Sequence, residues 1–277
     1  MSNISAAAVK SLRDRTNAPM MDCKAALIEA NGDMEKAIEI IRKKNSAIQV
    51  AKGDRETAEG RIAAYINSAK HVGAILEMRC ESAPVAKNEH FVKLADTVAK
   101  EAALGLVTTP EALLSQKLHD HPTQTVNDRI GDVVGILREK MKPERFTRLS
   151  GVLGSYCHHN GSLGVLIQVE GNVTDQQILS DVCMHIAARN PVALRREDVS
   201  KEVIDKELDI AKTQAAATGK PANIVEKIAE GKMKTWFAEN VLLEQPFVKD
   251  DSKTVGDLLK GAGLKLVKFV YYKVGVR

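Results

Sequence analysis

The feature that most constrains the fold is a pattern that occurs twice, with an offset of 91 residues from Tyr65 to Tyr156. Five residues of the segment 152–169 align without a gap with five residues of an earlier segment: Tyr156, Gly164, Val165, Leu166 and Ile167 with Tyr65, Gly73, Ala74, Ile75 and Leu76. In the earlier segment, β-type residues at 61–66 and 72–79 flank the turn-like residues 67–71. This succession of strand, turn and strand predicts a β-hairpin in both places.

A helical pattern follows each predicted hairpin. The first helix is expected to begin near Glu89 and to end at Gly105. Its predicted buried face consists of Phe91, Leu94, Ala95, Val98 and Ala102. The second helix carries Ile178, Val182 and Ile186 at helical spacing. We therefore predict an α+β fold with an internally duplicated antiparallel core, and coincidence in a single repeat is the alternative that stays open.

Three short helices are predicted ahead of this core, within residues 1–52. The first, at 4–15, has Ser5 as its cap and ends at Asn17–Ala18–Pro19. The second, at 20–30, turns Cys23, Ala26 and Leu27 inward, and Asn31–Gly32–Asp33 supplies a left-handed turn. The third contains Met34, Ala37, Ile38 and Ile41. A bundle this small buries little surface, so we expect it to be attached to a larger partner.

The remaining boundaries follow from changes in composition. Residues 53–56 form a linker, and core subdomains are predicted at 56–147 and 148–277. A strongly charged helical hairpin is inserted at about 197–237, with a break at 218–221. It is either a solvated arm or an arm that reaches a partner or a second copy in a homodimer or two-to-two complex. Strand residues return at 264–276.

Composition excludes several classes of function. With 44% hydrophobic and 27% charged residues, the chain has the composition of a soluble globular protein. The net charge is only +4, and the basic residues are scattered rather than gathered in one patch. Aromatic residues, on which bases could stack, make up 4% of the chain, so no nucleic-acid partner is expected. No apolar stretch is long enough to span a membrane, and charged residues lie where a signal peptide needs apolar ones. The four cysteines are far apart. We expect a cytoplasmic protein with reduced thiols and no membrane partner.

Motifs for catalysis and for cofactors are missing from the sequence. Neither GxxxxGK[ST] nor GxGxxG occurs, and Gly261–Ala262–Gly263 is interpreted as a turn. GxSxG and HExxH are absent as well. The best metal candidate is a set of cysteines and histidines: Cys157, His158, His159, Cys183 and His185. Strand alternation and helical spacing point these side chains in different directions, so no metal is predicted. We expect a protein that binds without catalysing a reaction and that needs no cofactor.

A family resemblance indicates which partner such a binding protein would have. The run Arg13–Leu27, with Met20–Met21–Asp22–Cys23–Lys24 at its centre, closely resembles the N-terminal signature of elongation factor Ts. The resemblance continues in order through further segments: Val85–Lys87, Val152–Tyr156, Leu163–Leu166, Met184–Ala188, Gly219–Pro221, Glu230–Met233, Gln245–Val248 and Ser252–Val255. It implies a ubiquitin-associated-like N-terminal module and guanine-nucleotide exchange on elongation factor Tu, with no nucleotide bound by the factor itself. The alternative is a chaperone-like module for the same GTPase with weakened exchange.

The resemblance also implies specific residues. Met20 and Met21 resemble the docking methionines of the family, with Leu12 beside them, and His158 resembles a histidine presented to the GTPase, although His159 is its neighbour. Because adjacent residues on a helix diverge by about 100°, we expect one methionine to pack inward and the other to be available.

One segment departs from the family pattern. Ser82–Ala83–Pro84 stands before Val85 where the family has Thr-Asp-Phe, whose acid and ring are thought to intrude into the GTPase and disturb its magnesium ion. Ala83 has no carboxylate, and Pro84 offers only an apolar wedge. Glu81 could supply a displaced carboxylate, which strand alternation would aim differently. We predict that binding is retained and that GDP release is accelerated less than in relatives with the full motif.

Overall fold

The computed structural model describes residues 4–217, 219 and 221–276, and the chain divides into two units. The first unit contains the described residues up to Leu149, together with 157–164 and those from Tyr272. The second unit contains 150–156 and 165–271. Helices and open antiparallel sheets occur together, which confirms the predicted α+β class. No described helix combines the length and the apolar character that would let it cross a membrane.

The first unit begins with the three predicted helices, α1 (Ala6–Thr16), α2 (Met20–Glu29) and α3 (Met34–Ala51). The Ser5 side chain accepts a hydrogen bond from the Ala8 N–H at 3.1 Å, as expected of a helix cap. Asn17 ends α1 with a φ of 51°, and Gly32 turns the chain into α3 with a φ of 86°. The small core of this bundle is formed by Val9, Leu12, Ala18, Cys23, Ala26, Leu27, Ala30, Ala37 and Ile41.

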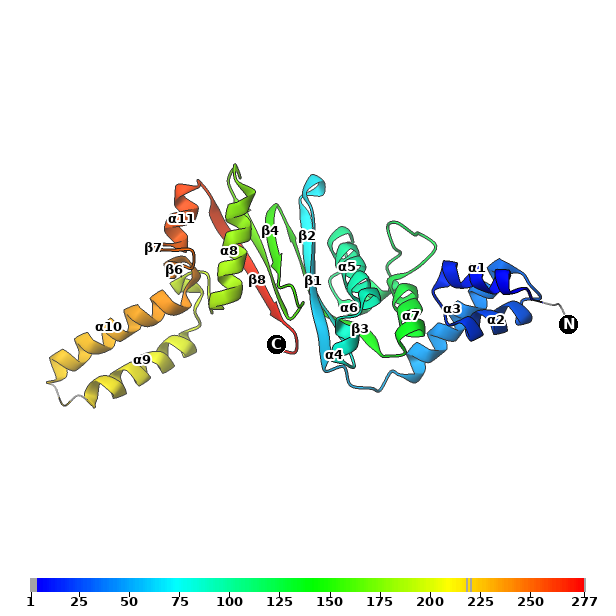
Figure 1. Cartoon of the computed structure of the whole chain (residues 1–277). Helices are drawn as coiled ribbons and strands as arrows, with labels where there is room; N and C mark the ends of the chain where they lie inside the picture. Colours follow the sequence, from blue (N-terminus) through cyan, green and yellow to red (C-terminus); the bar gives the residue numbers. More distant parts are fainter. Residues whose placement is uncertain (1–3, 218, 220, 277) are drawn as a thin grey trace. The chain divides into compact units, whose positions relative to one another are not determined.

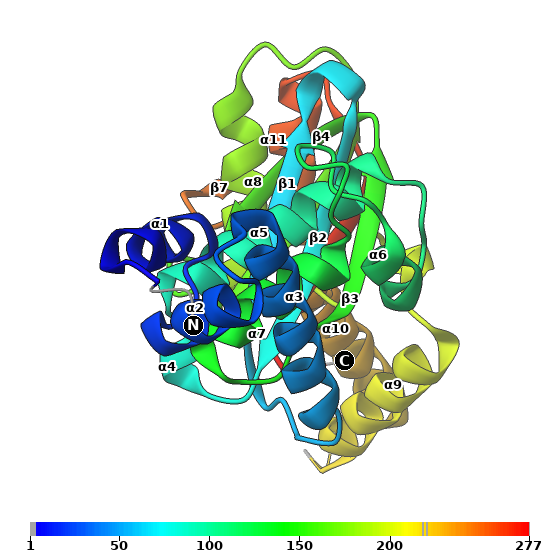
Figure 2. The same cartoon turned by 90° about the vertical axis from the view of Figure 1, so that its right-hand side faces the viewer.

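Helix α3 continues beyond the bundle and packs against α7 (Val126–Leu137), as Figures 1 and 2 show. The contact includes polar groups beside the apolar Ile48: Asn45 is buried, and the Gln49 Nε2 donates to the Asn127 Oδ1 at 2.9 Å. Gly135 makes the close approach possible, because a Cβ at this position would lie 2.1 Å from the Asn45 Oδ1. Amide side chains, a glycine and the partly buried Ile48 therefore attach the helical module to the first core.

The first sheet has the order β1 (Glu59–Asn67), β2 (Val72–Cys80) and β3 (Met141–Ser150). The predicted hairpin is confirmed: β1 and β2 are antiparallel, with Tyr65 opposite Ala74, and the single-turn helix η1 (Ser68–Lys70) lies between them. Helix α5 (Glu89–Leu104) packs on this hairpin (Figure 1). The apolar face of α5 is buried against β2, as the spacing predicted. Two short helices complete the core, α4 (Ala83–Ala86) and α6 (Pro110–Ser115).

The second unit is built on a sheet of the same order, β4 (Val152–Cys157), β5 (Leu163–Glu170) and β8 (Lys265–Lys273). Helix α8 (Gln176–Arg189) packs on it, with Val182 and Ile186 buried against β5. A hairpin, a covering helix and a third strand beside the second strand thus occur in both units, and the two hairpins are related by the 91-residue offset. The strand expected at the end of the chain is β8.

The remaining elements of the second unit include the inserted helical hairpin, formed by α9 (Lys201–Ala216) and α10 (Ala222–Asn240). Its helices pack through an apolar contact around Ala211, Ala215, Ala229 and Met233. Thr218 and Lys220 of the predicted break lie outside the described residues. The other elements are η2 (Arg196–Asp198), η3 (Leu242–Glu244), β6 (Pro246–Phe247), β7 (Asp250–Thr254) and α11 (Val255–Gly261).

Candidate functional site

Both methionines of the N-terminal signature are on the surface. Met20 is 50% exposed and Met21 is 73% exposed. The prediction that one of them packs inward is therefore wrong. The reason is that α2 begins at Met20, so both side chains lie in its first turn, whereas its buried stripe begins at Cys23. Two adaptable thioether side chains are thus available together, a composition typical of surfaces that bind other proteins.

A third apolar side chain extends this surface along α2. Ile28 is 52% exposed and lies seven residues after Met21, with the exposed Ala25 between them. Positions i, i+4 and i+7 share one face of a helix, so these residues form a continuous apolar stripe directed away from the bundle core. Sequence reasoning missed Ile28, although its helical spacing from Met21 was a signal that could have identified it. We call Met20, Met21, Ala25 and Ile28 the docking face.

Leu12 has a different position from the methionines. Its side chain is fully buried, at 0% exposure, in the core of the helical module. A direct contact of Leu12 with a partner stays a prediction. In this structure Leu12 supports the bundle from which the docking face projects.

Asp22 fixes the docking helix to its surroundings. Its Oδ1 accepts from the Lys44 Nζ of α3 at 2.7 Å, and its Oδ2 accepts from the Arg138 Nη2 at 2.6 Å. Burial by itself would raise the pKa of Asp22, but the hydrogen bonds and charges of Lys44 and Arg138 outweigh it and hold that pKa below its usual value. The carboxylate is therefore ionised and paired on both sides at neutral pH.

The segment after β2 is a short helix and not a strand, so the expected alternation of side chains does not apply. Ser82 precedes the first turn of α4, and Ala83 and Pro84 are exposed on it, whereas Val85 is partly buried against the first core. The Ser82 backbone N–H and its hydroxyl donate to the Glu139 carboxylate at 3.0 and 2.5 Å. The helix therefore presents a methyl group and a proline ring, on a backbone that is firmly held.

Glu81 does not replace the missing carboxylate at the tip of this segment. Its Oε1 accepts from the backbone N–H of Lys140 at 2.6 Å, and its Oε2 pairs with Arg55 at 3.1 Å. Burial by itself would raise the pKa of Glu81. The hydrogen bond from Lys140 and the pair with Arg55 outweigh burial, so the pKa lies below its usual value. The Glu81 carboxylate therefore links the end of β2 to Arg55 of the linker and to Lys140.

His158 directly follows β4 in the turn that leads to β5. Its backbone N–H donates to the Leu163 carbonyl at 3.0 Å, and its carbonyl accepts from the Gly161 N–H at 2.8 Å. The His158 and His159 rings lie 4.3 Å apart, and His159 is the more exposed of the two. The structure places both at the tip of the second hairpin, and the contact of His158 with a partner stays a prediction.

Comparisons with known proteins decide the family. The family described as "Elongation factor TS" matches residues 81–276. Elongation factor Ts of Thioalkalivibrio sulfidiphilus is 42% identical over 276 residues, which cover 98% of this chain and 92% of the relative. The chain belongs to the elongation factor Ts family. Elongation factor Ts of Clostridium botulinum strain Alaska E43 is 40% identical over 284 residues, covering 98% and 93%. As a family member, the chain is a translation elongation factor.

The structure shows the contacts of several of the cysteines and histidines that were considered for a metal site. No group of metal-binding side chains is found among the described residues. The His185 Nδ1 accepts from the Val248 N–H at 3.2 Å, which leaves its Nε2 to donate to the Gln245 Oε1 at 2.9 Å. Burial raises the pKa of Cys157 to about 11 and that of Cys80 to about 12, so both thiols are protonated at neutral pH. Neither is a reactive thiolate.

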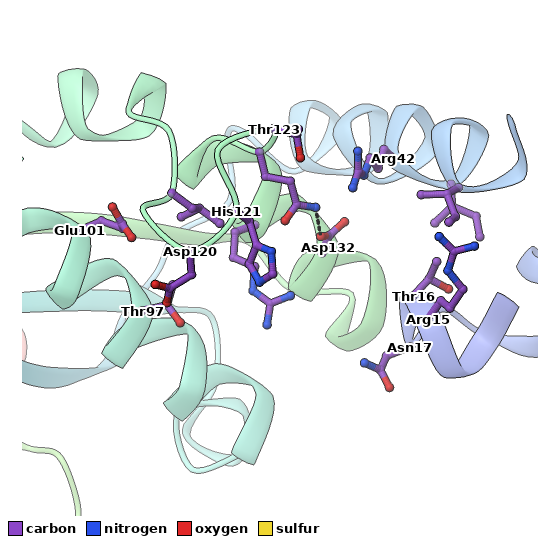
Figure 3. Close-up of a pocket in the computed structure, with 15 residues that line it drawn as sticks. Arg15, Thr16, Asn17, Arg42, Thr97, Glu101, Asp120, His121, Thr123 and Asp132 are labelled. Carbon is purple, nitrogen blue, oxygen red and sulfur yellow. Dashed lines mark hydrogen bonds between the residues drawn. The ribbon is translucent and has the colours of Figure 1, made fainter. Parts of the chain in front are cut away.

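A cavity of about 520 Å³ lies in the first unit of the chain. Figure 3 shows side chains of α1 and α3 on one side of it, with Arg15 and Arg42, and side chains of the core on the other, with Asp120 and Asp132. Arg15 pairs with Glu35 at 2.7 Å, and Asp120 pairs with Lys100 at 2.6 Å. Because ligand pockets are lined mainly by apolar side chains, this polar lining does not indicate a small-molecule site.

Proposed function

We propose that this chain promotes the release of GDP from elongation factor Tu. The observation that carries the proposal is the family membership along nearly the whole chain, combined with a docking face that exposes Met20 and Met21. Exposed apolar side chains on a small helical module are suited to binding a protein surface.

The proposed mechanism is a coupling between two binding events. A factor that prefers the nucleotide-free GTPase weakens GDP by the same factor by which GDP weakens the complex. The docking face supplies affinity, whereas Ser82, Ala83, Pro84 and Val85 approach the magnesium and phosphate site. Pro84 is exposed and can act as an apolar wedge, but no carboxylate accompanies it. The magnesium ion is therefore disturbed less strongly than by an acid and an aromatic ring together.

A chaperone-like module for elongation factor Tu is the second candidate. The observation that favours it is the exposed Ala83–Pro84 pair, which stands where the family pattern has an acid and an aromatic residue. Such a module would stabilise the GTPase by mass action without accelerating nucleotide release. The two candidate functions differ in one measurable quantity, the rate of GDP release.

The helical hairpin is also proposed to bind a partner. It exposes the apolar side chains of Val203, Ile210 and Ile224, which suit a contact with elongation factor Tu or with a second copy of the chain. The chain itself is proposed to bind neither nucleotide nor nucleic acid, and to act in the cytoplasm.

The deciding experiment measures the release of fluorescent GDP from elongation factor Tu at increasing concentrations of the chain. Exchange predicts a release rate that rises with concentration and saturates. Binding measured in parallel by calorimetry identifies the alternative. Saturable binding with an unchanged release rate would establish the chaperone-like module and reject exchange, and an absence of binding would reject both.

A further inference from the structure

Three consecutive residues between α7 and β3 contact both partner-facing regions of the first unit. They are Arg138, Glu139 and Lys140, and we call them the 138–140 strap. Arg138 reaches the docking helix, where its Nη2 donates to the Asp22 Oδ2 at 2.6 Å. The two residues are 116 positions apart in the sequence. This ion pair fixes the first turn of α2, where Met20 and Met21 lie, to the end of α7.

The other two residues of the strap hold the segment after β2. Glu139 accepts both hydrogen bonds from Ser82, and the Lys140 backbone N–H donates to Glu81. The Lys140 ammonium also donates to the carbonyls of Gly53 and Arg55, the latter at 2.8 Å. The linker, the docking helix and the segment that contains Ala83 and Pro84 therefore converge on three adjacent residues.

The backbone conformation of Arg138 is a second observation that bears on the role of its side chain. Arg138 ends α7 in the left-handed region with a φ of 58°, and its N–H donates to the Val134 carbonyl at 2.8 Å. Glycine or asparagine is favoured at such a helix end, whereas other residues cost about 1 kcal/mol there. Since the Arg138 side chain is 41% exposed, apolar burial contributes little to offset this cost. The ion pair with Asp22 is what the arginine adds.

We propose that the 138–140 strap is a positioning element that holds the docking face and the segment 82–85 in one fixed geometry, with Arg138 as its positioning residue toward the docking helix. The proposal rests on the proposed function, because it deepens the way in which one bound GTPase meets both regions. When the docking face is engaged, a rigid strap brings Ala83 and Pro84 to a defined place on the same partner. Without it, the docking helix is attached only through the packing of α3 on α7, and the second contact forms at a lower effective concentration.

Arg138→Gly tests this positioning role against a purely structural one. Glycine suits the left-handed backbone, so the variant is expected to fold with an unchanged or higher midpoint of thermal unfolding. If Arg138 only ends α7, glycine should serve as well as or better than arginine in every assay. If Arg138 positions the docking helix, the maximal rate of GDP release should fall by about five- to tenfold while the midpoint is preserved.

Two further variants complete the design. Asp22→Asn removes the other partner of the ion pair and also weakens the pair with Lys44, so combining it with Arg138→Gly should cost no more than Asp22→Asn alone. Glu139→Gln weakens the hold on Ser82 and should lower the maximal rate without raising the concentration needed for half-saturation. The matched control is Glu39→Gln, which removes a carboxylate from the exposed pair with Lys43 on α3 and should change neither quantity.

Hydrogen exchange of the free chain separates the strap from the exchange function. In Arg138→Gly, the amides of α2 should exchange several-fold faster relative to those of α5 than in the natural protein. Unchanged protection of α2 would overturn the positioning role whatever the GTPase assay gives. If the natural protein failed to accelerate GDP release, the proposed function would fall, and faster exchange of α2 in the variant would still support the strap.

Discussion

The docking face and the segment 82–85 are the two regions proposed to contact elongation factor Tu, and both are held by the 138–140 strap, but they differ in chemistry. The docking face keeps its full apolar character, with Met20, Met21 and Ile28 all at least half exposed. The segment 82–85 is equally well held through Ser82, yet it presents only a methyl group and a proline ring. Both regions are therefore well anchored, but the segment 82–85 presents no carboxylate and no aromatic ring.

This difference implies that affinity and rate can change separately in this molecule. Apolar contacts that form equally in all states of a complex contribute affinity, and only contacts that favour the nucleotide-free state accelerate release. We therefore expect substitutions in the docking face to change the concentration dependence of exchange. Substitutions in the segment 82–85 should change its maximal rate.

The largest effect is expected from removing the methionines. Met20→Ala combined with Met21→Ala should raise the half-saturating concentration of the chain by about 30-fold, which corresponds to about 2 kcal/mol for a pair of central apolar contacts. The maximal rate should change little. The concentration dependence of fluorescent-GDP release measures both. Val50→Ala is the control, since Val50 is 78% exposed on α3 outside the docking face. An equal effect of Val50→Ala would contradict a localised docking face.

The next effect concerns the segment that lacks the acid and the ring. Ala83→Asp combined with Pro84→Phe should raise the maximal rate of GDP release by about tenfold, equivalent to about 1.4 kcal/mol of added preference for the nucleotide-free state. Both positions are exposed, so the core should tolerate the change. Ala83→Asn with Pro84→Phe keeps the size and removes the charge, and it should recover less of the rate. No gain with the aspartate variant would mean that the natural segment is already fully effective.

Much of this arrangement could be predicted from the sequence, and the reasons are local. Helical spacing identified α2 and α5, and the 91-residue offset placed both hairpins. Helix α7 was missed although Thr125 and Asp128 form a capping box ahead of it, which is a recognisable signal. The ion pair between Asp22 and Arg138 could not have been predicted, because nothing in either local sequence indicates a contact across 116 positions.

A smaller effect is expected at the contact between α3 and α7, which supports both regions. Gly135→Ala places a Cβ 2.1 Å from the Asn45 Oδ1, and it should lower the free energy of unfolding of the first unit by about 1 kcal/mol, because the amide must move. Gly131→Ala is the matched control, since its Cβ would lie 3.3 Å from the Gln49 Oε1. Chemical denaturation of the two variants measures the difference. Equal stability would show that α3 adjusts freely on α7.

The smallest effect is a pH dependence that distinguishes the surroundings of the neutral His185 in the second unit from those of the ionised Asp22 in the first. Burial and the charge of Arg189 lower the pKa of His185, and the hydrogen bond to Gln245 only partly opposes them. A pKa that is depressed in the folded state means that the unfolded chain binds the proton more readily, so stability is complete above the unfolded pKa of about 6.5 and is lost as pH falls below it. Between pH 7 and pH 6 the second unit should lose less than about 1 kcal/mol.

The docking helix should not share this dependence. The pKa of Asp22 is lowered, so its pairs with Lys44 and Arg138 contribute stability above pH 3.8 and lose it only as pH falls through the depressed folded value. Hydrogen exchange at pH 7 and pH 6, corrected for intrinsic rates, should therefore show loosening around α8 and constant protection of α2. His185→Gln, whose amide can make both hydrogen bonds, should abolish the change at α8. Loosening of α2 over the same range would mean that a group other than Asp22 controls the docking face.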